Sequence, residues 1–321
     1  MSQYERMVIV TGNANRQLAE AIARYVKRPL GDALVTRFRD GETRVLLRDD
    51  VRGADVFIIQ PTSPPVNQHV MELLVMIDAA KRASAGRITA VLPYYGYSRQ
   101  EKKTVGREPI SAKLVADLIQ RAGAHRVLTV DLSNPAIEGF FDIPVDHLHA
   151  GPLLAHHVQR LLRETHDIVV AAPDVGAVRL ADRFRSYLDN APLAVLFKDR
   201  PQPDEVTMQG LIGDVVGKTV VLVDDLISTG GTLIAAADLL EANGARTVIA
   251  VATHPVLAEG ALERLAASAL YTVFVTDAIP VPNPPEAIRV ISLAPLLAEA
   301  INRVHYDISV SELMHQPRLP L

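Results

Sequence analysis

The stretch Val220–Leu233, VVLVDDLISTGGTL, passes from a strand through two acids and a small turn into a helix. Its four leading apolar residues are typical of a buried strand, and the residues after Leu233 have the spacing of an amphipathic helix. A glycine-rich turn between a strand and a helix binds phosphate, because backbone N–H groups and the helix dipole face the anion. The stretch therefore predicts a phosphate-binding loop made of Ser228, Thr229, Gly230, Gly231 and Thr232.

Two acids, Asp224 and Asp225, stand directly before this loop. Carboxylates repel phosphate, so vicinal sugar hydroxyls, or a metal ion that bridges to them, are their natural ligands. A phosphate site beside a diol site predicts a ribose 5-phosphate moiety. An ordinary strand–helix turn capped by Ser or Thr is the alternative for the turn residues alone. The complete string resembles the signature shared by phosphoribosyltransferases and the synthetases of phosphoribosyl pyrophosphate (PRPP).

The composition favours an α/β protein with parallel sheets. Of the 321 residues, 49% are hydrophobic but only 5% are aromatic. A net charge of −4 gives no support for a nucleic-acid partner, and the absence of cysteine excludes disulfides and thiolate chemistry. No segment has the apolar length of a signal peptide or a membrane span. We therefore expect a cytoplasmic protein without a membrane partner.

Strands and helices alternate along both halves of the chain. Apolar runs of strand length lie at residues 55–60, 87–92, 168–172, 219–223 and 247–252, while residues from 136 onward read as a short connection. Right-handed crossovers then give a doubly wound parallel sheet in each half, with ligand sites at the carboxyl ends of the strands. We expect two tandem phosphoribosyltransferase-like domains, at residues 1–150 and 151–305, and a tail at 306–321.

Two pairs of residues follow other strand ends. Arg99 and Gln100 open a basic loop where a doubly wound sheet places its ligands, so the loop suits a polyphosphate, although a solvated loop is the alternative. Lys198 and Arg200 lie two residues apart after an apolar run. Such a cationic pair can stabilise a pentavalent phosphorus transition state, with a solvent-facing or capping role as the alternative.

Further candidates are single acids, an aromatic residue and histidines. An extended segment is expected to carry Phe38, Asp40 and Glu42, which are two residues apart and would therefore project to one side. An aromatic ring beside two acids suits an adenine ring and its amino group. The alternative is the ordinary alternation of side chains on a strand. Asp174 is a lone acid after a strand, where it suits either a ligand-binding role or a role as a turn or cap residue. The histidines at 147, 149, 156 and 157 lack zinc-site spacing, so we expect surface or core roles for them.

Several strings extend the resemblance over almost the whole chain, from about residue 8 to residue 313. The chain is similar to ribose-phosphate pyrophosphokinases, the PRPP synthetases, in RFRDGE (37–42), LPYYGYSRQEKK (92–103), GFFDIPVDHL (139–148) and ATHPVL (252–257). Phosphoribosyltransferases share only the loop and have one such domain. The resemblance implies transfer of the pyrophosphoryl group of MgATP to the C1 hydroxyl of ribose 5-phosphate, which gives PRPP and AMP for nucleotide biosynthesis.

The resemblance also implies roles for the candidate residues. It implies adenine binding from a neighbouring subunit by Phe38, Asp40 and Glu42, ATP binding by Arg99 and Gln100, and catalysis by Lys198 and Arg200 on a mobile flap. It further implies metal and ribose binding by Asp174, ribose binding by Asp224 and Asp225, and phosphate binding by the loop at 228–232. Mg²⁺ is the implied cofactor, and a hexamer assembled from dimers is the implied oligomer.

A regulatory site is implied as well, since the commonest class of the family is activated by inorganic phosphate and inhibited by ADP. Ser309 and Ser311 resemble part of that site, and Arg52 does so more weakly. The glutamine usual in the site is Glu138 in this chain, and an acid there repels phosphate.

Two departures from the family pattern keep a second function open. The usual Asp-Leu-His is Asp131-Leu132-Ser133, which lacks the histidine that binds metal and ATP phosphates, and Asp199 stands where a further basic residue is usual. The alternative is a non-catalytic homologue that binds nucleotide and co-assembles with an active synthetase. A phosphoribosyltransferase rests on the loop alone and fits the N-terminal half badly.

Overall fold

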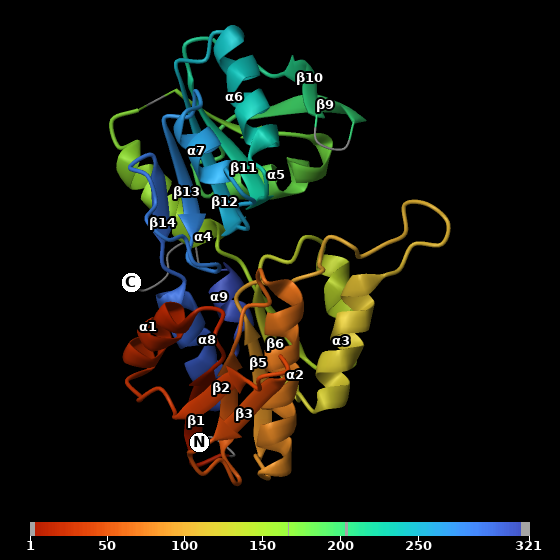
Figure 1. Ribbon diagram of the computed structural model, residues 1–321. Helices are drawn as coiled ribbons and strands as arrows, with labels where there is room; N and C mark the ends of the chain where they lie inside the picture. The colour runs from red at the N-terminus through yellow and green to blue at the C-terminus, as the bar shows by residue number, and fades with distance from the viewer. Residues whose placement is uncertain (1–3, 166, 203–204, 316–321) are drawn as a thin grey trace. The chain divides into compact units, whose positions relative to one another are not determined.

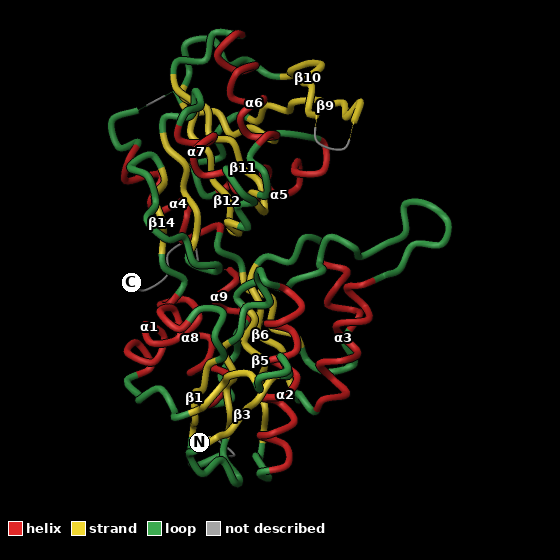
Figure 2. The backbone as a smooth tube through the Cα atoms, in the orientation of Figure 1, coloured by secondary structure: helices red, strands yellow, loops and turns green. Residues whose placement is uncertain are grey.

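The structure is a computed structural model that describes residues 4–165, 167–202 and 205–315 (Figure 1). The described chain forms two compact units. The first comprises residues 4–149, 278–280 and 292–315, and the second comprises residues 150–277 and 281–291 apart from the gaps. In both units helices lie beside the strands (Figure 2).

The first unit is built around a parallel five-stranded sheet in the order β1-β4-β5-β6-β7. These strands are β1 (Met7–Thr11), β4 (Asp55–Ile59), β5 (Arg87–Leu92), β6 (Arg126–Val130) and β7 (Val145–Leu148). Every residue of β4 is buried. A strand covered on both faces must be apolar throughout, as the sequence of β4 is.

Helices cover both faces of this sheet. Helices α1 (Arg16–Val26) and α8 (Ala294–His305) pack together on one side, and α2 (Val66–Arg82) and α3 (Ser111–Ala122) pack together on the other (Figure 1). An antiparallel hairpin, β2 (Ala33–Arg37) and β3 (Thr43–Leu47), lies against α2. The unit also contains the short helices η1 (Pro135–Phe140) and α9 (Ser311–His315).

The chain changes direction across the sheet after β1. Leu30 forms a single parallel bridge with Ile9 on the side of β1 away from β4. The chain therefore leaves β1 toward one edge and later enters β4 on the opposite side. Such a reversal creates a crevice at the carboxyl ends of the two strands, which is the usual ligand position in open α/β sheets.

The second unit contains a seven-stranded sheet in the order β10-β9-β8-β11-β12-β13-β14, parallel except for β10. Its strands are β8 (Ile168–Ala172), β9 (Leu193–Gln202), β10 (Glu205–Ile212), β11 (Thr219–Ile227), β12 (Thr247–Pro255), β13 (Thr272–Thr276) and β14 (Ile288–Ile291). From β8 the chain moves to β9 in one direction, and from β11 it moves to β14 in the other. The switch point lies between β8 and β11.

The helices of the second unit are α4 (Gly151–Leu161), η2 (Val175–Ala177), α5 (Val178–Ser186), α6 (Gly231–Ala242) and α7 (Ala261–Ala266). Val220 and Leu222 of β11 share a buried core with Leu233 and Leu240 of α6. Successive side chains of a strand point to opposite faces, so β11 is held on this face by α6 while Val221 and Val223 are buried on the opposite face.

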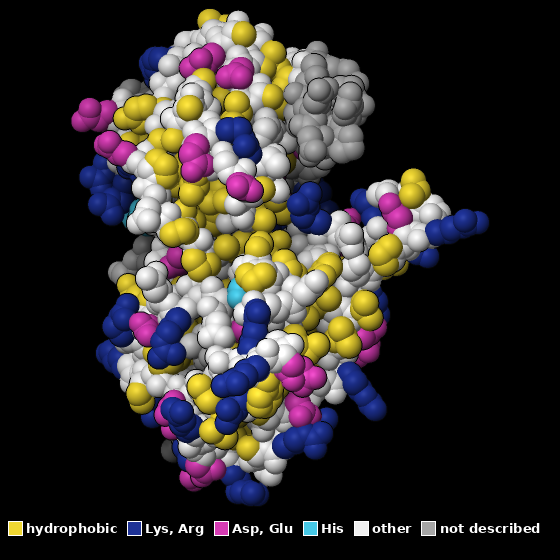
Figure 3. All heavy atoms as spheres, in the orientation of Figure 1, with side chains coloured by type: hydrophobic (Ala, Val, Ile, Leu, Met, Phe, Trp, Pro, Cys, Tyr) yellow, Lys and Arg dark blue, Asp and Glu magenta, His cyan; other side chains and the backbone are white. Residues whose placement is uncertain are grey.

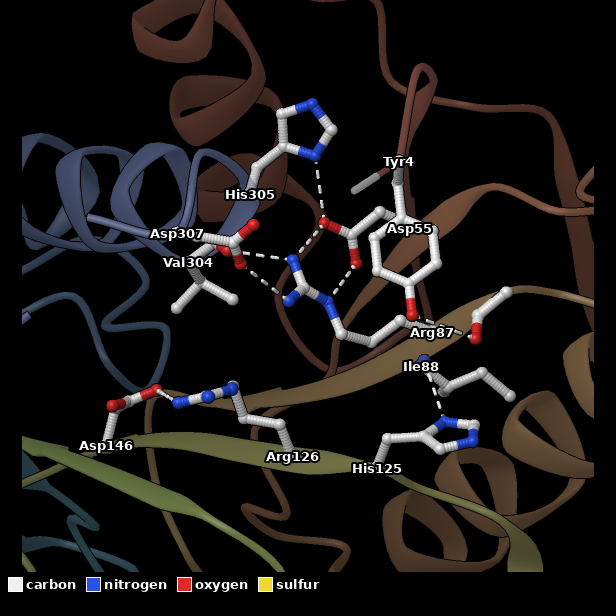
Figure 4. Close-up of polar contacts among 11 residues, drawn as sticks. Tyr4, Asp55, Arg87, Ile88, His125, Arg126, Asp146, Val304, His305 and Asp307 are labelled. Carbon is white, nitrogen blue, oxygen red and sulfur yellow. Dashed lines mark hydrogen bonds and ion pairs between the residues drawn. The ribbon is translucent and has the colours of Figure 1, made fainter. Parts of the chain in front are cut away.

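Helix α8 belongs to a different unit from the one that we expected. We expected residues 294–305 to close the second domain, but α8 belongs to the first unit and packs on α1. The fully buried Asp55 accepts hydrogen bonds from Arg87 Nη2 (2.6 Å) and bonds His305 Nδ1 (2.9 Å), and Arg87 also donates to the Val304 carbonyl (2.8 Å) (Figure 4). A buried charge needs such partners, and these tie α8 to β4 and β5.

Candidate functional site

The predicted phosphate loop connects β11 to α6 in the second unit. Gly230 caps the helix with φ of +80°, and a Cβ atom built there would lie 3.1 Å from Leu265 Cγ. Only glycine adopts this backbone conformation without strain. The Gly231 N–H donates to Thr229 Oγ1 (3.4 Å) at the start of α6. The loop therefore has the strand–turn–helix geometry that the sequence predicts.

Acidic residues gather at the switch point beside this loop. Asp224 and Asp225 lie in the last part of β11, and Asp174 follows the neighbouring strand β8. Asp224 Oδ1 accepts the Asp225 N–H (2.9 Å), and Asp174 Oδ1 accepts the Ala177 N–H (3.1 Å). Burial, with the negative charges of Asp225 and Asp174, raises the pKa of Asp224 well above its ordinary value.

The donor set at the switch point suits a hard divalent cation. Asp174, Asp224 and Asp225 offer carboxylate oxygens, which Mg²⁺ prefers over nitrogen or sulfur ligands. The charges of Asp225 and Asp174 also act on Asp224, and a cation or the hydroxyls of a sugar would relieve that repulsion. Asp174 caps η2, which agrees with its reading as a turn residue, and it also acts electrostatically on Asp224. Its role as a ligand stays a prediction.

The predicted catalytic pair lies at the β9–β10 hairpin. Lys198 pairs with Met208, and Asp199 pairs with Thr207, in an antiparallel ladder. The backbone of Arg200 also belongs to β9. The side chains of Lys198 and Arg200 lie outside the described residues, so their catalytic role stays a prediction.

The expected extended segment at Phe38–Glu42 is wrong, because these residues form the turn of the β2–β3 hairpin. The Gly41 N–H donates to the Phe38 carbonyl (3.0 Å), and Asp40 Oδ1 accepts the Glu42 N–H (3.1 Å). Gly41 turns the chain with φ of +97°. The structure still brings the aromatic ring and the two acids together, at an exposed hairpin tip where the Arg44 guanidinium lies 5.6 Å from the Phe38 ring centre.

Residues predicted for ATP binding follow β5 and β6 in the first unit. Arg99 is exposed, and Gln100 Oε1 accepts a hydrogen bond from Ser111 Oγ at the start of α3. Ser133 lies after β6, where its hydroxyl is 3.0 Å from Ser98 Oγ. The loops after β5 and β6 are thus joined at the carboxyl edge of the sheet, the edge at which parallel sheets bind ligands.

A group of metal-ligating side chains at this edge was not predicted. Ligand atoms of Asp131, His147 and His149 lie within 4.8 Å of one another. However, His147 Nε2 accepts the Leu132 N–H (2.9 Å) and its Nδ1 contacts Glu138 (2.6 Å), so both ring nitrogens are engaged. Burial lowers the pKa of His147, which keeps the ring neutral. His147 is therefore a buried structural histidine, as expected, and it does not have a free ring nitrogen with which to bind a metal ion.

The predicted regulatory residues all lie in the first unit. Ser309 Oγ is 2.7 Å from Ser311 Oγ, at the start of α9, and α9 packs against β7. Arg52 is exposed and its N–H donates to Asp50 Oδ1 (3.0 Å). Glu138 is held by His147. Their regulatory role stays a prediction.

Comparison with known proteins agrees with this architecture. A model of the N-terminal domain of ribose phosphate pyrophosphokinase matches residues 7–123, and a model of the phosphoribosyl synthetase-associated domain matches residues 190–315. The chain belongs to the ribose-phosphate pyrophosphokinase family. A relative of that name from Thermotoga maritima is 51% identical over 316 residues, which cover 98% of this chain and 99% of the relative.

Other family members agree over the same length. The ribose-phosphate pyrophosphokinase of Thermosipho africanus is 49% identical over 310 residues, covering 97% of this chain and 98% of the relative. A crystal structure of phosphoribosylpyrophosphate synthetase from Mycobacterium smegmatis superposes with a TM-score of 0.88 at 43% identity, covering 94% of this chain and 99% of that chain. The family resemblance therefore includes both units and the fold of each.

Proposed function

We propose that this protein is a ribose-phosphate diphosphokinase that transfers the diphosphoryl group of ATP to the C1 hydroxyl of ribose 5-phosphate. The observation that carries the proposal is the switch point of the second unit, where three carboxylates stand beside a glycine-rich anion loop, in a chain about half identical to ribose-phosphate pyrophosphokinases over its full length. A phosphate site and a diol site side by side match the two ends of ribose 5-phosphate.

In the proposed reaction the loop at 228–232 binds the 5-phosphate, and Asp224 and Asp225 accept hydrogen bonds from the ribose hydroxyls. The C1 oxygen then forms a bond to the β-phosphorus of ATP. The bond between that phosphorus and the oxygen of the α-phosphate breaks, AMP leaves, and the C1 hydroxyl loses its proton. Lys198 and Arg200 supply the positive charge that this transition state needs.

Mg²⁺ is the proposed cofactor. Asp174, with the acidic pair of β11, offers the oxygen ligands that suit it. Ser133 offers only a neutral hydroxyl at the position where the family resemblance implies a histidine that binds metal and ATP phosphates. When bound, Mg²⁺ would neutralise the triphosphate and align its oxygens. The chain itself orients the sugar through its carboxylates and holds the 5-phosphate through the loop.

We also propose a homo-oligomer assembled from dimers, as the family resemblance implies. Phe38 is 49% exposed at the tip of the β2–β3 hairpin. Ile110, at the N-cap of α3, and Leu114 and Leu118 within α3 are exposed at intervals of about one turn. The face of this unit that Figure 3 shows also carries many charged side chains. Exposed apolar rows of this kind mark interaction surfaces. In such an assembly Phe38, Asp40 and Glu42 would bind adenine at a neighbouring subunit.

The described chain contains no helix with the length and apolar character needed to span a bilayer. A cytoplasmic location is part of the proposal and rests on the family resemblance.

The test is AMP formation by the purified chain with ribose 5-phosphate, ATP and Mg²⁺, with and without inorganic phosphate. We expect turnover in the parent protein and a loss of about 100-fold or more in Asp224→Asn, a substitution of the same shape. A Ser133→His variant shows whether the hydroxyl limits the rate. Absence of AMP from both the parent and Ser133→His, with nucleotide still bound, would favour the non-catalytic homologue.

A further inference from the structure

Three consecutive carbonyl groups, one at the end of β11 and two in the phosphate loop, are bonded from behind by one segment, residues 257–264. The Leu257 N–H donates to the Ile227 carbonyl, and the Ala258 N–H donates to the Ser228 carbonyl, both at 2.9 Å. The Arg264 guanidinium donates through Nη2 to the Thr229 carbonyl, also at 2.9 Å. Backbone groups make the first two bonds, but a single side chain makes the third.

These bonds decide where the loop's N–H groups point. In a trans peptide the carbonyl and the N–H of the following residue point in opposite directions. Holding the three carbonyls toward residues 257–264 therefore turns the N–H groups of Ser228, Thr229 and Gly230 to the other side of the loop. None of these three N–H groups donates to any part of the chain that the structure describes. Successive free N–H groups of this kind form an anion-binding concavity.

We propose that Arg264 is a positioning residue for ribose 5-phosphate, which fixes the Thr229–Gly230 peptide so that the Gly230 N–H faces the 5-phosphate. This inference rests on the proposed function, because it takes the loop at 228–232 as the 5-phosphate site. Arg264 does not touch the phosphate itself. It acts from α7 through the Thr229 carbonyl, and its charge behind the loop also favours a dianion.

The surroundings of Arg264 hold its guanidinium in this position. Its Nη1 donates to the Glu259 carbonyl (3.4 Å), and a Cβ atom at Gly260 would lie 2.9 Å from the same nitrogen. The missing side chain of Gly260, whose φ is +74°, therefore leaves room for the guanidinium. The next residue, Leu265, is buried against Gly230. Residues 260–265 thus support the loop at two adjacent points.

Because Arg264 is exposed, its removal is expected to change the loop more than the stability of the unit. The experiment compares the parent with Arg264→Ala, Arg264→Lys and a matched control, Arg246→Ala. Arg246 is an exposed arginine in the same unit, and it donates to Thr219 Oγ1 (3.2 Å) at the opposite end of β11. The readouts are KM for ribose 5-phosphate, KM for ATP, kcat and the midpoint of thermal unfolding.

In Arg264→Ala we expect KM for ribose 5-phosphate to rise about tenfold, equivalent to about 1.4 kcal/mol. We expect KM for ATP and kcat to stay within about twofold of the parent values, because the lost contact weakens binding of the sugar phosphate equally in the ground state and in the transition state. We expect the unfolding midpoint to match that of Arg246→Ala. Arg264→Lys should recover part of the loss, because it keeps a charged donor on the same side of the loop.

Two results would overturn the inference. One is an unchanged KM for ribose 5-phosphate in Arg264→Ala, and the other is an equal loss in both KM values together with a lower unfolding midpoint. Calorimetric titration of ribose 5-phosphate into the parent and into Arg264→Ala separates this inference from the proposed function. A parent that binds ribose 5-phosphate without forming AMP contradicts the proposed function alone, whereas equal binding by the two proteins, or none by the parent, contradicts the role of Arg264.

Discussion

Asp174 follows β8 and Asp224 lies in the adjacent parallel strand β11, at the point where the strand order of the second sheet reverses. Asp174 acts electrostatically on Asp224, which is half-buried and next to Asp225. Ionising all three carboxyl groups in the ligand-free site is therefore unfavourable. Sites of this kind give up some stability in order to bind a cation or sugar hydroxyls.

The first prediction concerns the charge of Asp224. Burial and neighbouring carboxylates raise its pKa above the ordinary value of 3.8, so the folded state holds the protonated form more tightly than the unfolded state does. Stability is then lost as pH rises above 3.8. Asp224→Asn should stabilise the ligand-free protein at pH 7 by about 1 kcal/mol while it lowers AMP formation by about 100-fold or more. Urea unfolding at pH 7 measures the first effect, and Asp182→Asn, on the exposed face of α5, is the control.

The second prediction concerns the backbone of the phosphate loop. Gly230→Ala places a side chain at φ of +80° and within 3.1 Å of Leu265 Cγ, so we expect a cost of about 1–3 kcal/mol and weaker binding of ribose 5-phosphate. Gly139→Ala is the matched control, because no atom lies within 4 Å of a Cβ built there and its φ is not positive. Equal KM values for ribose 5-phosphate in the two variants would contradict the prediction.

Much of the fold could be predicted because fully buried parallel strands are apolar along their whole length. The expected strands at 55–60, 87–92 and 168–172 match β4, β5 and β8 to within one residue. Strand β7, with the sequence VDHL, and β14, with the sequence IRVI, were not predicted, since short strands that mix polar and apolar residues carry little periodic signal. The apolar face of α8 was predictable, but periodicity does not say which sheet it covers.

The candidate site was predictable where function depends on residue type at a strand end. Asp174, Asp224 and the loop at 228–232 stand at the carboxyl ends of neighbouring strands, as expected. The turn at Phe38–Glu42 was not, because Gly41 reverses the chain between residues that read as one extended run. Arg264 left no signal in the sequence. It acts by bonding a backbone carbonyl from six-residue helix α7, and such a contact depends only on how the chain folds.

The third prediction concerns a buried glutamate at the switch point of the first unit. Glu72 accepts hydrogen bonds from Gln60 Nε2 (2.8 Å), Gln68 Nε2 (3.0 Å) and the N–H and side-chain amide of Asn13 (3.2 and 3.0 Å). Burial raises the pKa of Glu72, but these bonds outweigh it and hold the pKa below its ordinary value of 4.5. Its contribution to stability is thus present above pH 4.5 and lost as pH falls through the lower folded-state pKa.

The measurement is urea unfolding of the parent and Glu72→Gln between pH 3 and pH 7. At pH 7 we expect the variant to be less stable by about 2 kcal/mol. The NH₂ of the new amide would face N–H donors whose hydrogen bonds the carboxylate accepts in the parent. The difference should shrink below pH 4.5, where the parent takes up a proton at Glu72. Gln68→Glu is a useful comparison, since it places a second negative charge beside Glu72 and should reverse the pH trend. A difference independent of pH would show that Glu72 is not ionised in the folded protein.

The last prediction concerns the attachment of α8 to the first unit. Asp55 is fully buried and accepts two hydrogen bonds from Arg87, from Nε to Oδ1 (2.8 Å) and from Nη2 to Oδ2 (2.6 Å), and His305 Nδ1 also contacts Oδ2. Asp55→Ala leaves the largely buried Arg87 without its main charge partner, so we expect a loss of about 3–5 kcal/mol. Asp307→Ala is the control. It removes only a 3.5 Å contact from Arg87 to an exposed carboxylate, and should cost less than about 1 kcal/mol.

Amide hydrogen exchange then distinguishes loosening of α8 from unfolding of the whole unit. If α8 is held mainly by this cluster, its amides in Asp55→Ala exchange before those of β4 and β5, whereas simultaneous exchange means that its packing on α1 dominates.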